Sequence, residues 1–87
     1  MQLPKRVFQS PLLRFANFRG AGWINLIRIN KPYANGYSYA VYTTCEGDSN
    51  MFKSFESAKE YFDKIVRLAK GKHELTSEGV TGNEEKY

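Results

Sequence analysis

The chain has 87 residues, 41% of them hydrophobic and 25% charged, and its net charge is +4. This length and composition predict one small folded domain and exclude a disordered chain. Arginine, lysine or asparagine interrupts every hydrophobic stretch before it reaches the roughly 18 residues that a membrane helix needs, so we expect no membrane partner.

Cysteine usage and the first residues bear on the cellular compartment. Cys45 is the only cysteine, which excludes an internal disulfide and a metal site built from several cysteines. We therefore expect a reducing, cytoplasmic location. Residues 1–22 are rich in arginine and contain no acid, as mitochondrial presequences are, but Pro4 and Pro11 disfavour a targeting helix.

Positive charge is concentrated in the first half of the chain. Residues 1–45 carry six bases and no acid, a charge of +6, while residues 46–87 carry seven bases and nine acids, a charge of −2, which together give +4. An acid-free half predicts a polyanionic or acidic partner, although chance in a short sequence is the alternative. The six bases are Lys5, Arg6, Arg14, Arg19, Arg28 and Lys31.

The first expected element is a short helix over residues 11–19. Ser10 is suited to the N-cap, Pro11 to the first helical position and Gly20 to the residue past the end. Two turns of helix are marginal on their own. The alternative is an irregular arm held by Phe15 and Phe18.

Two strands are expected next. Residues 23–29 are rich in strand-forming side chains with apolar residues on both faces, which predicts a strand covered on both sides or kinked. Residues 37–44 alternate in the manner of a strand. Between them Asn35 and Gly36 favour a type I′ hairpin turn, but Pro32 lacks a backbone donor and indicates an irregular end or a longer loop.

A turn and a third strand follow. The polar cluster at residues 46–50 predicts a turn, after which residues 51–53 return as a short strand. Ser54 or Ser57 then caps an amphipathic helix that ends at Gly71. Residues 72–87 have few apolar side chains and are expected to form a mobile tail.

The predicted fold class is therefore α+β. A three-stranded antiparallel sheet packs against one C-terminal amphipathic helix, with a short N-terminal helix or arm over residues 1–22. Residues 1–71 form the single domain, and residues 72–87 form the flexible tail.

Catalytic and cofactor chemistry has few candidate residues. His73 lies beyond the helix in the expected tail, and Cys45 lies where a strand meets a turn, so no element positions either side chain. Gly20 to Gly22 lacks the lysine and hydroxyl residue of a phosphate-binding loop. Glu46 and Asp48 supply too few oxygen ligands for a calcium loop. We therefore expect a protein that is not an enzyme and has no catalytic residues, no metal and no cofactor.

Arginine interleaved with aromatic residues predicts a binding surface. Nucleic-acid binders combine cations that contact phosphates with flat rings on which unpaired bases stack. The first hypothesis is a nucleic-acid-binding accessory or regulatory protein. The alternative is a protein-binding module, such as an inhibitor of a host protein encoded by a phage or mobile element, and a homodimer through a strand edge is a further possibility. The candidate residues for contacting DNA, RNA or an acidic protein surface are Arg14, Arg19, Trp23, Arg28, Lys31, Tyr33, Tyr37 and Tyr39.

The tyrosines among these candidates have a structural alternative, because tyrosine packs well in cross-strand pairs. The strands followed by Phe52 to Phe62 resemble the sheet and helix of AP2-type domains and of the arm-binding domains of phage integrases. That resemblance covers about residues 23–70 and implies a sheet that enters the DNA major groove, yet basic strand residues are sparse here. The element order is also similar to that of double-stranded-RNA-binding domains, but the lysine cluster at the start of their last helix is absent.

Overall fold

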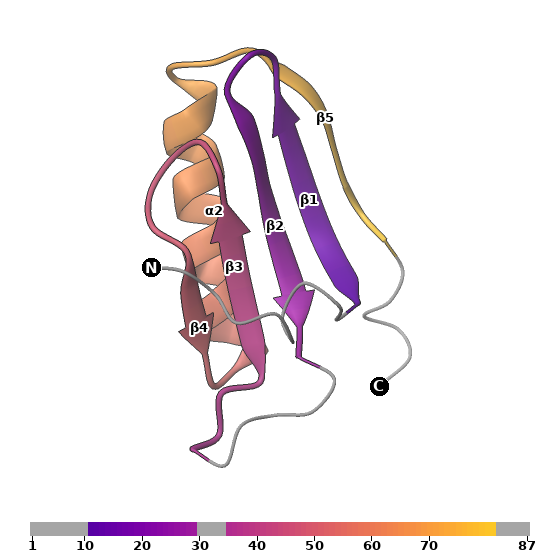
Figure 1. Cartoon of the computed structure of the whole chain (residues 1–87), viewed down its shortest axis with the longest axis vertical. Coiled ribbons are helices and arrows are strands. Elements are labelled where there is room, and N and C mark those ends of the chain that lie inside the picture. The colour runs from indigo at the N-terminus through magenta and orange to yellow at the C-terminus, as the bar shows by residue number, and fades with distance from the viewer. Residues whose placement is uncertain (1–10, 30–34, 82–87) are drawn as a thin grey trace.

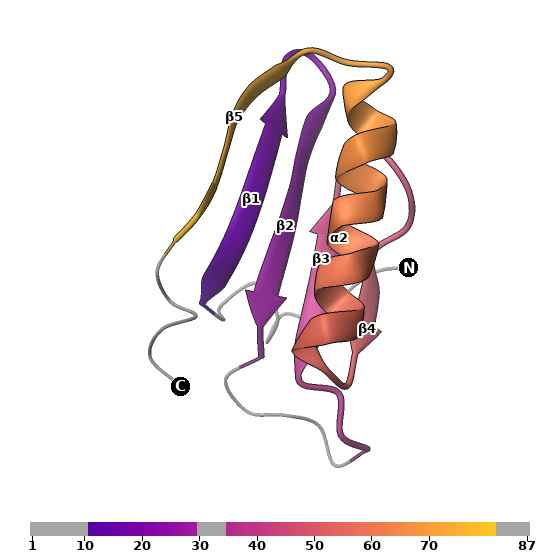
Figure 2. The same cartoon turned by 180° about the vertical axis from the view of Figure 1, so that it is seen from behind.

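The computed structural model describes residues 11–29 and 35–81, which form one antiparallel sheet with a helix on one side (Figures 1 and 2). The strands lie in the order β4-β3-β2-β1-β5. Within the described residues no helix has the length and apolar character needed to cross a membrane. The elements are β1 (Leu12–Phe18), β2 (Gly22–Arg28), β3 (Tyr39–Thr43), β4 (Asn50–Phe52), α2 (Phe55–Lys70) and β5 (Leu75–Val80).

Residues 12–18 form β1, so the expected short helix and its alternative, an irregular arm, are both wrong over these residues. β1 pairs with β2 on one edge and with β5 on the other, and Leu13 and Ala16 are fully buried. The residues favour a strand because aromatic side chains pack well on a pleated surface and two isolated helical turns are unstable. Gly20 does adopt a left-handed conformation, with φ of 68°, but it serves the β1–β2 turn instead of a helix end.

The C-terminal prediction is wrong over residues 75–80, which form strand β5 instead of a mobile tail. β5 pairs antiparallel with β1, with Phe15 opposite Gly79 and Asn17 opposite Ser77. This strand and β1 bring the sheet to five strands where the sequence predicted three. The α+β class, the antiparallel sheet and the single long helix are confirmed.

β2 and β3 overlap the expected ranges, 23–29 and 37–44, and β2 is covered on both sides as predicted. In the central strand β2, Ile24 and Leu26 belong to the core beneath the helix, while Ile27 belongs to a second apolar cluster. The connection to β3 is longer than a two-residue turn, because the paired register begins with Arg28 opposite Tyr39. No described residue other than glycine has positive φ, so the type I′ prediction is wrong for Asn35.

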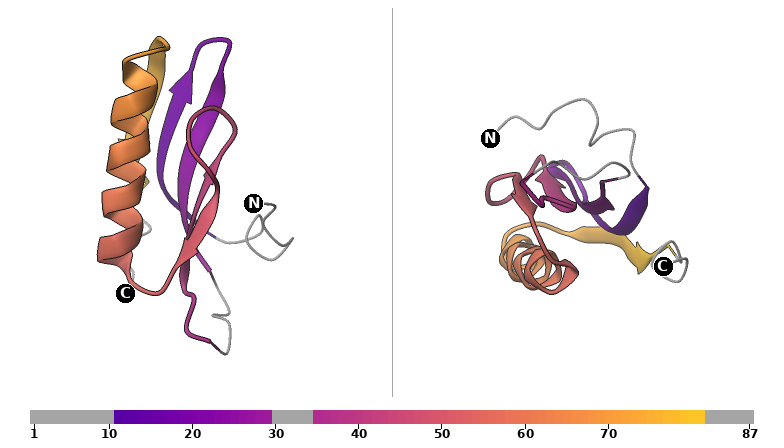
Figure 3. Two further views of the ribbon diagram at one scale, coloured as in Figure 1. Left: turned by 90° about the vertical axis from the view of Figure 1, so that its left-hand side faces the viewer. Right: turned by 90° about the horizontal axis from the view of Figure 1, so that it is seen from below.

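The third expected strand and the helix are confirmed as β4 and α2. Ser54 is the N-cap, and its hydroxyl oxygen accepts a hydrogen bond from the backbone N–H of Ser57 at 3.2 Å. α2 lies along one side of the sheet (Figure 3) and presents Ala58, Phe62, Ile65, Val66 and Ala69 to it. We call the opposite side of the sheet the far face. Its apolar cluster consists of Ile27, Ile29 and Ala40, with Leu12, Tyr42 and Met51 packed against them.

Candidate functional site

The predicted binding residues are divided between the two sides of the sheet. Arg14 and Tyr39 lie on the helix side. The guanidinium carbon of Arg14 is 5.6 Å from the ring centroid of Phe55, and the Tyr39 ring is 5.8 Å from the same ring. Arg28 lies opposite Tyr39 in the β2–β3 register and therefore shares that side. Trp23 lies on the far face, beside Tyr42.

The other candidates do not complete a basic patch. Arg19 occupies the β1–β2 turn, where it forms an exposed ion pair with Glu74, a residue of the acidic second half. Tyr37 lies before β3, with the Lys53 ammonium 5.7 Å from its ring centroid. Lys31 and Tyr33 lie outside the described residues. Of the described cations of the first half, Arg14 and Arg28 therefore lie on the helix side, and Arg19 is paired with a late glutamate.

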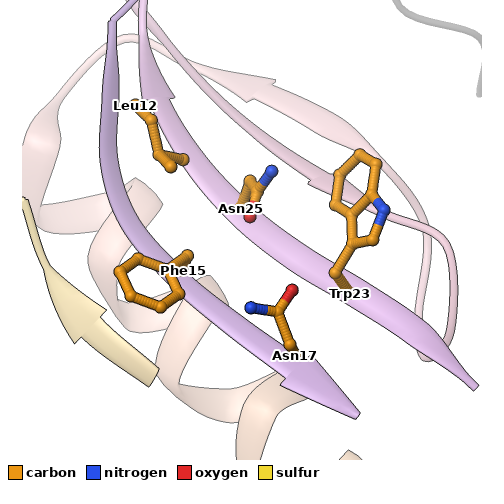
Figure 4. Close-up of a pocket in the computed structure, with 5 residues that line it drawn as sticks. All are labelled: Leu12, Phe15, Asn17, Trp23 and Asn25. Carbon is orange, nitrogen blue, oxygen red and sulfur yellow. The ribbon is translucent and has the colours of Figure 1, made fainter. Parts of the chain in front are cut away.

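The far face instead holds a shallow hollow between β1 and β2. Its volume is about 380 Å³, and Figure 4 shows two amides, Asn17 and Asn25, placed between the rings of Phe15 and Trp23. A volume of this size lies at the lower end of the range for small-ligand pockets. The five lining residues, none of them charged, are Leu12, Phe15, Asn17, Trp23 and Asn25.

Hydrogen bonds to Thr44, the residue just after β3, fix the position of Trp23. The backbone N–H of Trp23 donates to Thr44 Oγ1 at 2.9 Å, and the Thr44 backbone N–H donates to the Trp23 carbonyl at 2.9 Å. The indole ring lies against Tyr42, with centroids 4.8 Å apart and planes inclined by 47°. A tilted contact of this kind is favourable between aromatic rings. Trp23, which lines one edge of the hollow, is thus held by the sheet and by its contact with Tyr42.

Strand β5 shapes the other edge. Asn17 Nδ2 donates to Ser77 Oγ at 2.9 Å, which ties this amide to β5. A β-carbon at Gly79 would lie 3.2 Å from two ring carbons of Phe15, so the missing side chain leaves room for that ring. Phe15 therefore lies across β1 toward β5 because its partner in the register is glycine.

Two of the residues that line the hollow, Asn25 and Trp23, carry polar side-chain groups. The side-chain amide of Asn25 and the indole N–H of Trp23 make no hydrogen bond with any residue in the described ranges, and both side chains are only partly buried. An amide presents donors and an acceptor, whereas the indole nitrogen presents a donor alone. Figure 4 shows the indole nitrogen on the edge of the ring that faces away from Asn25, so the Asn25 amide is the one of these two groups that faces the hollow.

Sequence reasoning named Trp23 as a binding residue, but it missed the amides Asn17 and Asn25. One signal was present: Asn25 falls between Trp23 and Ile27 on the same side of an otherwise apolar strand. An amide at such a position either satisfies itself internally or serves a ligand. The partner of Asn17 could not be predicted, because the tail interpretation had removed β5 from the sheet.

Catalytic chemistry has no assembled centre among the described residues. They contain no cluster of three or more histidine, cysteine or acidic residues placed to hold a metal ion. Burial raises the pKa of the Cys45 thiol, although hydrogen bonds to Thr43 and the Glu46 backbone partly oppose this. A raised pKa keeps the thiol protonated and lowers its reactivity.

No protein-family model matches the chain, and no curated protein or solved structure is significantly similar to it.

Proposed function

We propose that this chain is a protein-binding module and that its partner docks on the far face over the hollow. The observation that carries the proposal is the character of this surface: two aromatic anchors and two amides, without a charged lining residue. The centres of protein interfaces are depleted of charge and enriched in aromatic residues, and tryptophan and tyrosine are frequent hot spots. The Trp23–Tyr42 pair supplies such an anchor.

The arrangement of the cations favours a protein over a nucleic acid. Affinity for nucleic acids depends on several cations that contact phosphates together. Arg14 and Arg28 lie on the side opposite the hollow, and Arg19 is paired with Glu74. Nucleic-acid binding stays a prediction that the same experiment tests.

A photo-crosslinking experiment tests the proposal. A benzophenone amino acid replaces Ser77, an exposed residue that adjoins the hollow through Asn17, in cells that naturally carry the chain. The matched control places the same crosslinker at Lys64, exposed on α2. We expect a discrete adduct from the first position and none from the second. Protease should destroy the adduct, whereas nuclease should leave it intact.

The dependence on the hollow is tested with Trp23→Ala in the Ser77 crosslinker background. Removal of the anchor should abolish the adduct, because truncation of a hot-spot residue costs about 2 kcal/mol or more of binding free energy. Equal adducts from Ser77 and Lys64 positions would refute the proposal. A nuclease-sensitive adduct would instead support the nucleic-acid hypothesis.

A further inference from the structure

We infer that the outer edge of strand β5 pairs antiparallel with the same edge of a second copy of this chain, so that two sheets join into one across a two-fold axis. The inference is independent of the hollow and of the proposed function. β5 ends the strand order, with β1 as its one neighbour among the described strands (Figure 1). The opposite end of the sheet is β4, which has three residues, so β5 offers the longer edge.

The backbone groups of β5 alternate between β1 and the outer edge. The Thr81 N–H donates to the Leu13 carbonyl at 2.9 Å, and every second residue of an antiparallel ladder repeats this bonding. Gly79 and Ser77 therefore direct their backbone N–H and C=O groups to β1. Glu78, between them, directs its own groups outward. An edge that presents such groups is a template for a further strand.

The edge lacks the features that usually prevent such pairing. Proteins protect edge strands with proline, lysine or bulges. β5 contains no proline and no lysine, and its register shift against β1 lies at the Leu75 end, so Ser77 to Val80 form a regular strand. Its one charged side chain, Glu78, already forms an ion pair with Lys70 at 3.2 Å. The edge is therefore open to a partner strand.

The charges beside β5 favour a second copy as that partner. The groove between α2 and β5 is lined by two apolar residues, two bases and two acids. A two-fold interface sets a surface against itself, so a patch of one sign would repel its copy, whereas equal numbers of both signs can pair across the axis. The four charged residues are Asp63, Arg67, Lys70 and Glu78.

The alternation of β5 and the position of Glu78 set the register. Two copies pair only where residues that direct backbone groups outward lie opposite each other. Glu78 opposite the partner's Glu78 would oppose like charges, which is destabilising. The neighbouring register that spans the whole strand places Ser77 opposite the partner's Ser77, on the two-fold axis, and Glu78 opposite the partner's Thr76. A shift the other way pairs fewer residues.

Disulfide trapping tests this register. Cys45 is the only cysteine, so a Cys45→Ala chain that carries Ser77→Cys can form a disulfide only between copies. Residues opposed in this way have Cα atoms about 4.5 Å apart, within reach of a disulfide. We expect mild oxidation to give a covalent dimer.

Two controls in the Cys45→Ala background should give no such dimer. Glu78→Cys would place the two Cα atoms roughly 8 Å apart, which is too far for a disulfide. Lys64→Cys lies exposed on α2, away from the edge.

The unmodified chain should show a concentration-dependent monomer–dimer equilibrium in analytical ultracentrifugation. Glu78→Pro removes the outward N–H and should weaken association about tenfold or more, because each copy loses one hydrogen bond to the other. Glu78→Thr removes the same carboxylate but keeps the N–H, so this matched control should still dimerise. Circular dichroism shows whether both variants are folded.

Three results would overturn the inference: a chain that stays monomeric at millimolar concentration, a folded Glu78→Pro chain that dimerises as well as Glu78→Thr, or equal crosslinking from Ser77→Cys and Lys64→Cys. An edge that takes up a foreign strand instead would leave the pure chain monomeric. The proposed function is judged separately, because its Ser77 adduct requires Trp23 and differs in mass from a dimer of this chain.

Discussion

Replacing Gly22 with alanine should destabilise the fold and displace the Trp23 anchor in one step. Gly22 has φ of 112°, a conformation that side-chain-bearing residues rarely adopt. A β-carbon there would overlap Thr44 Oγ1, the atom that accepts the hydrogen bond from the Trp23 backbone. The substitution therefore strains the backbone and pushes away the group that holds Trp23.

The expected loss of stability is the sum of these two effects. Backbone strain of this kind costs about 1–3 kcal/mol, and losing the hydrogen bond costs about 0.5–1.5 kcal/mol. The total of about 1.5–4.5 kcal/mol is a large share of the roughly 4–13 kcal/mol expected for a chain of this length. Urea denaturation measures it: with a slope of about 1.5 kcal/mol/M the midpoint should fall by about 1–3 M.

Gly20→Ala is the matched control for Gly22→Ala. Gly20 also has positive φ, at 68°, but a β-carbon there would meet no atom within 4 Å. It should cost only the backbone strain, about 1–2 kcal/mol, and leave the fluorescence of Trp23 unchanged. In a Thr44→Ala background, which removes the overlapping hydroxyl, Gly22→Ala should cost less than in the native chain. If Gly22→Ala is no more costly than Gly20→Ala, the argument from the Thr44 contact is refuted.

Three further predictions concern the rest of the fold. Ser54→Ala removes the cap of α2 and should lower the free energy of unfolding by about 1 kcal/mol in the same urea assay; no change would mean that the cap is dispensable. Ending the chain at Gly71 removes β5 and leaves the β1 edge unpaired, so the cooperative unfolding transition followed by circular dichroism should weaken or vanish, and an unchanged transition would contradict the role of β5. Because burial raises the pKa of Cys45, iodoacetamide should alkylate Cys45 at pH 8 more slowly in the folded chain than in the urea-unfolded chain; equal alkylation rates would contradict this. The contribution of this thiol to stability should decline as pH rises through the raised pKa, because the thiol of the unfolded chain ionises first.

Local pattern predicted the middle of the chain well and its ends poorly. β2, β3 and α2 carry clear alternation, helical spacing and a serine cap within their own residues. β1 and β5 are stabilised by each other, and no local pattern states that residues 12–18 and 75–80 are neighbours. With residues 75–80 assigned to a tail, residues 12–18 had no strand partner on that side, and their local pattern favoured a short helix.

The same pairing explains why charge asymmetry along the sequence did not become a basic surface. The sheet order places the C-terminal strand directly beside the N-terminal one, so the acidic part of the chain lies against the basic part. Glu74 reaches Arg19 at this junction, and strand alternation sends Arg14 and Arg28 to the helix side. The side chains that line the hollow on the far face are all neutral, so the charge asymmetry of the sequence does not reach this surface.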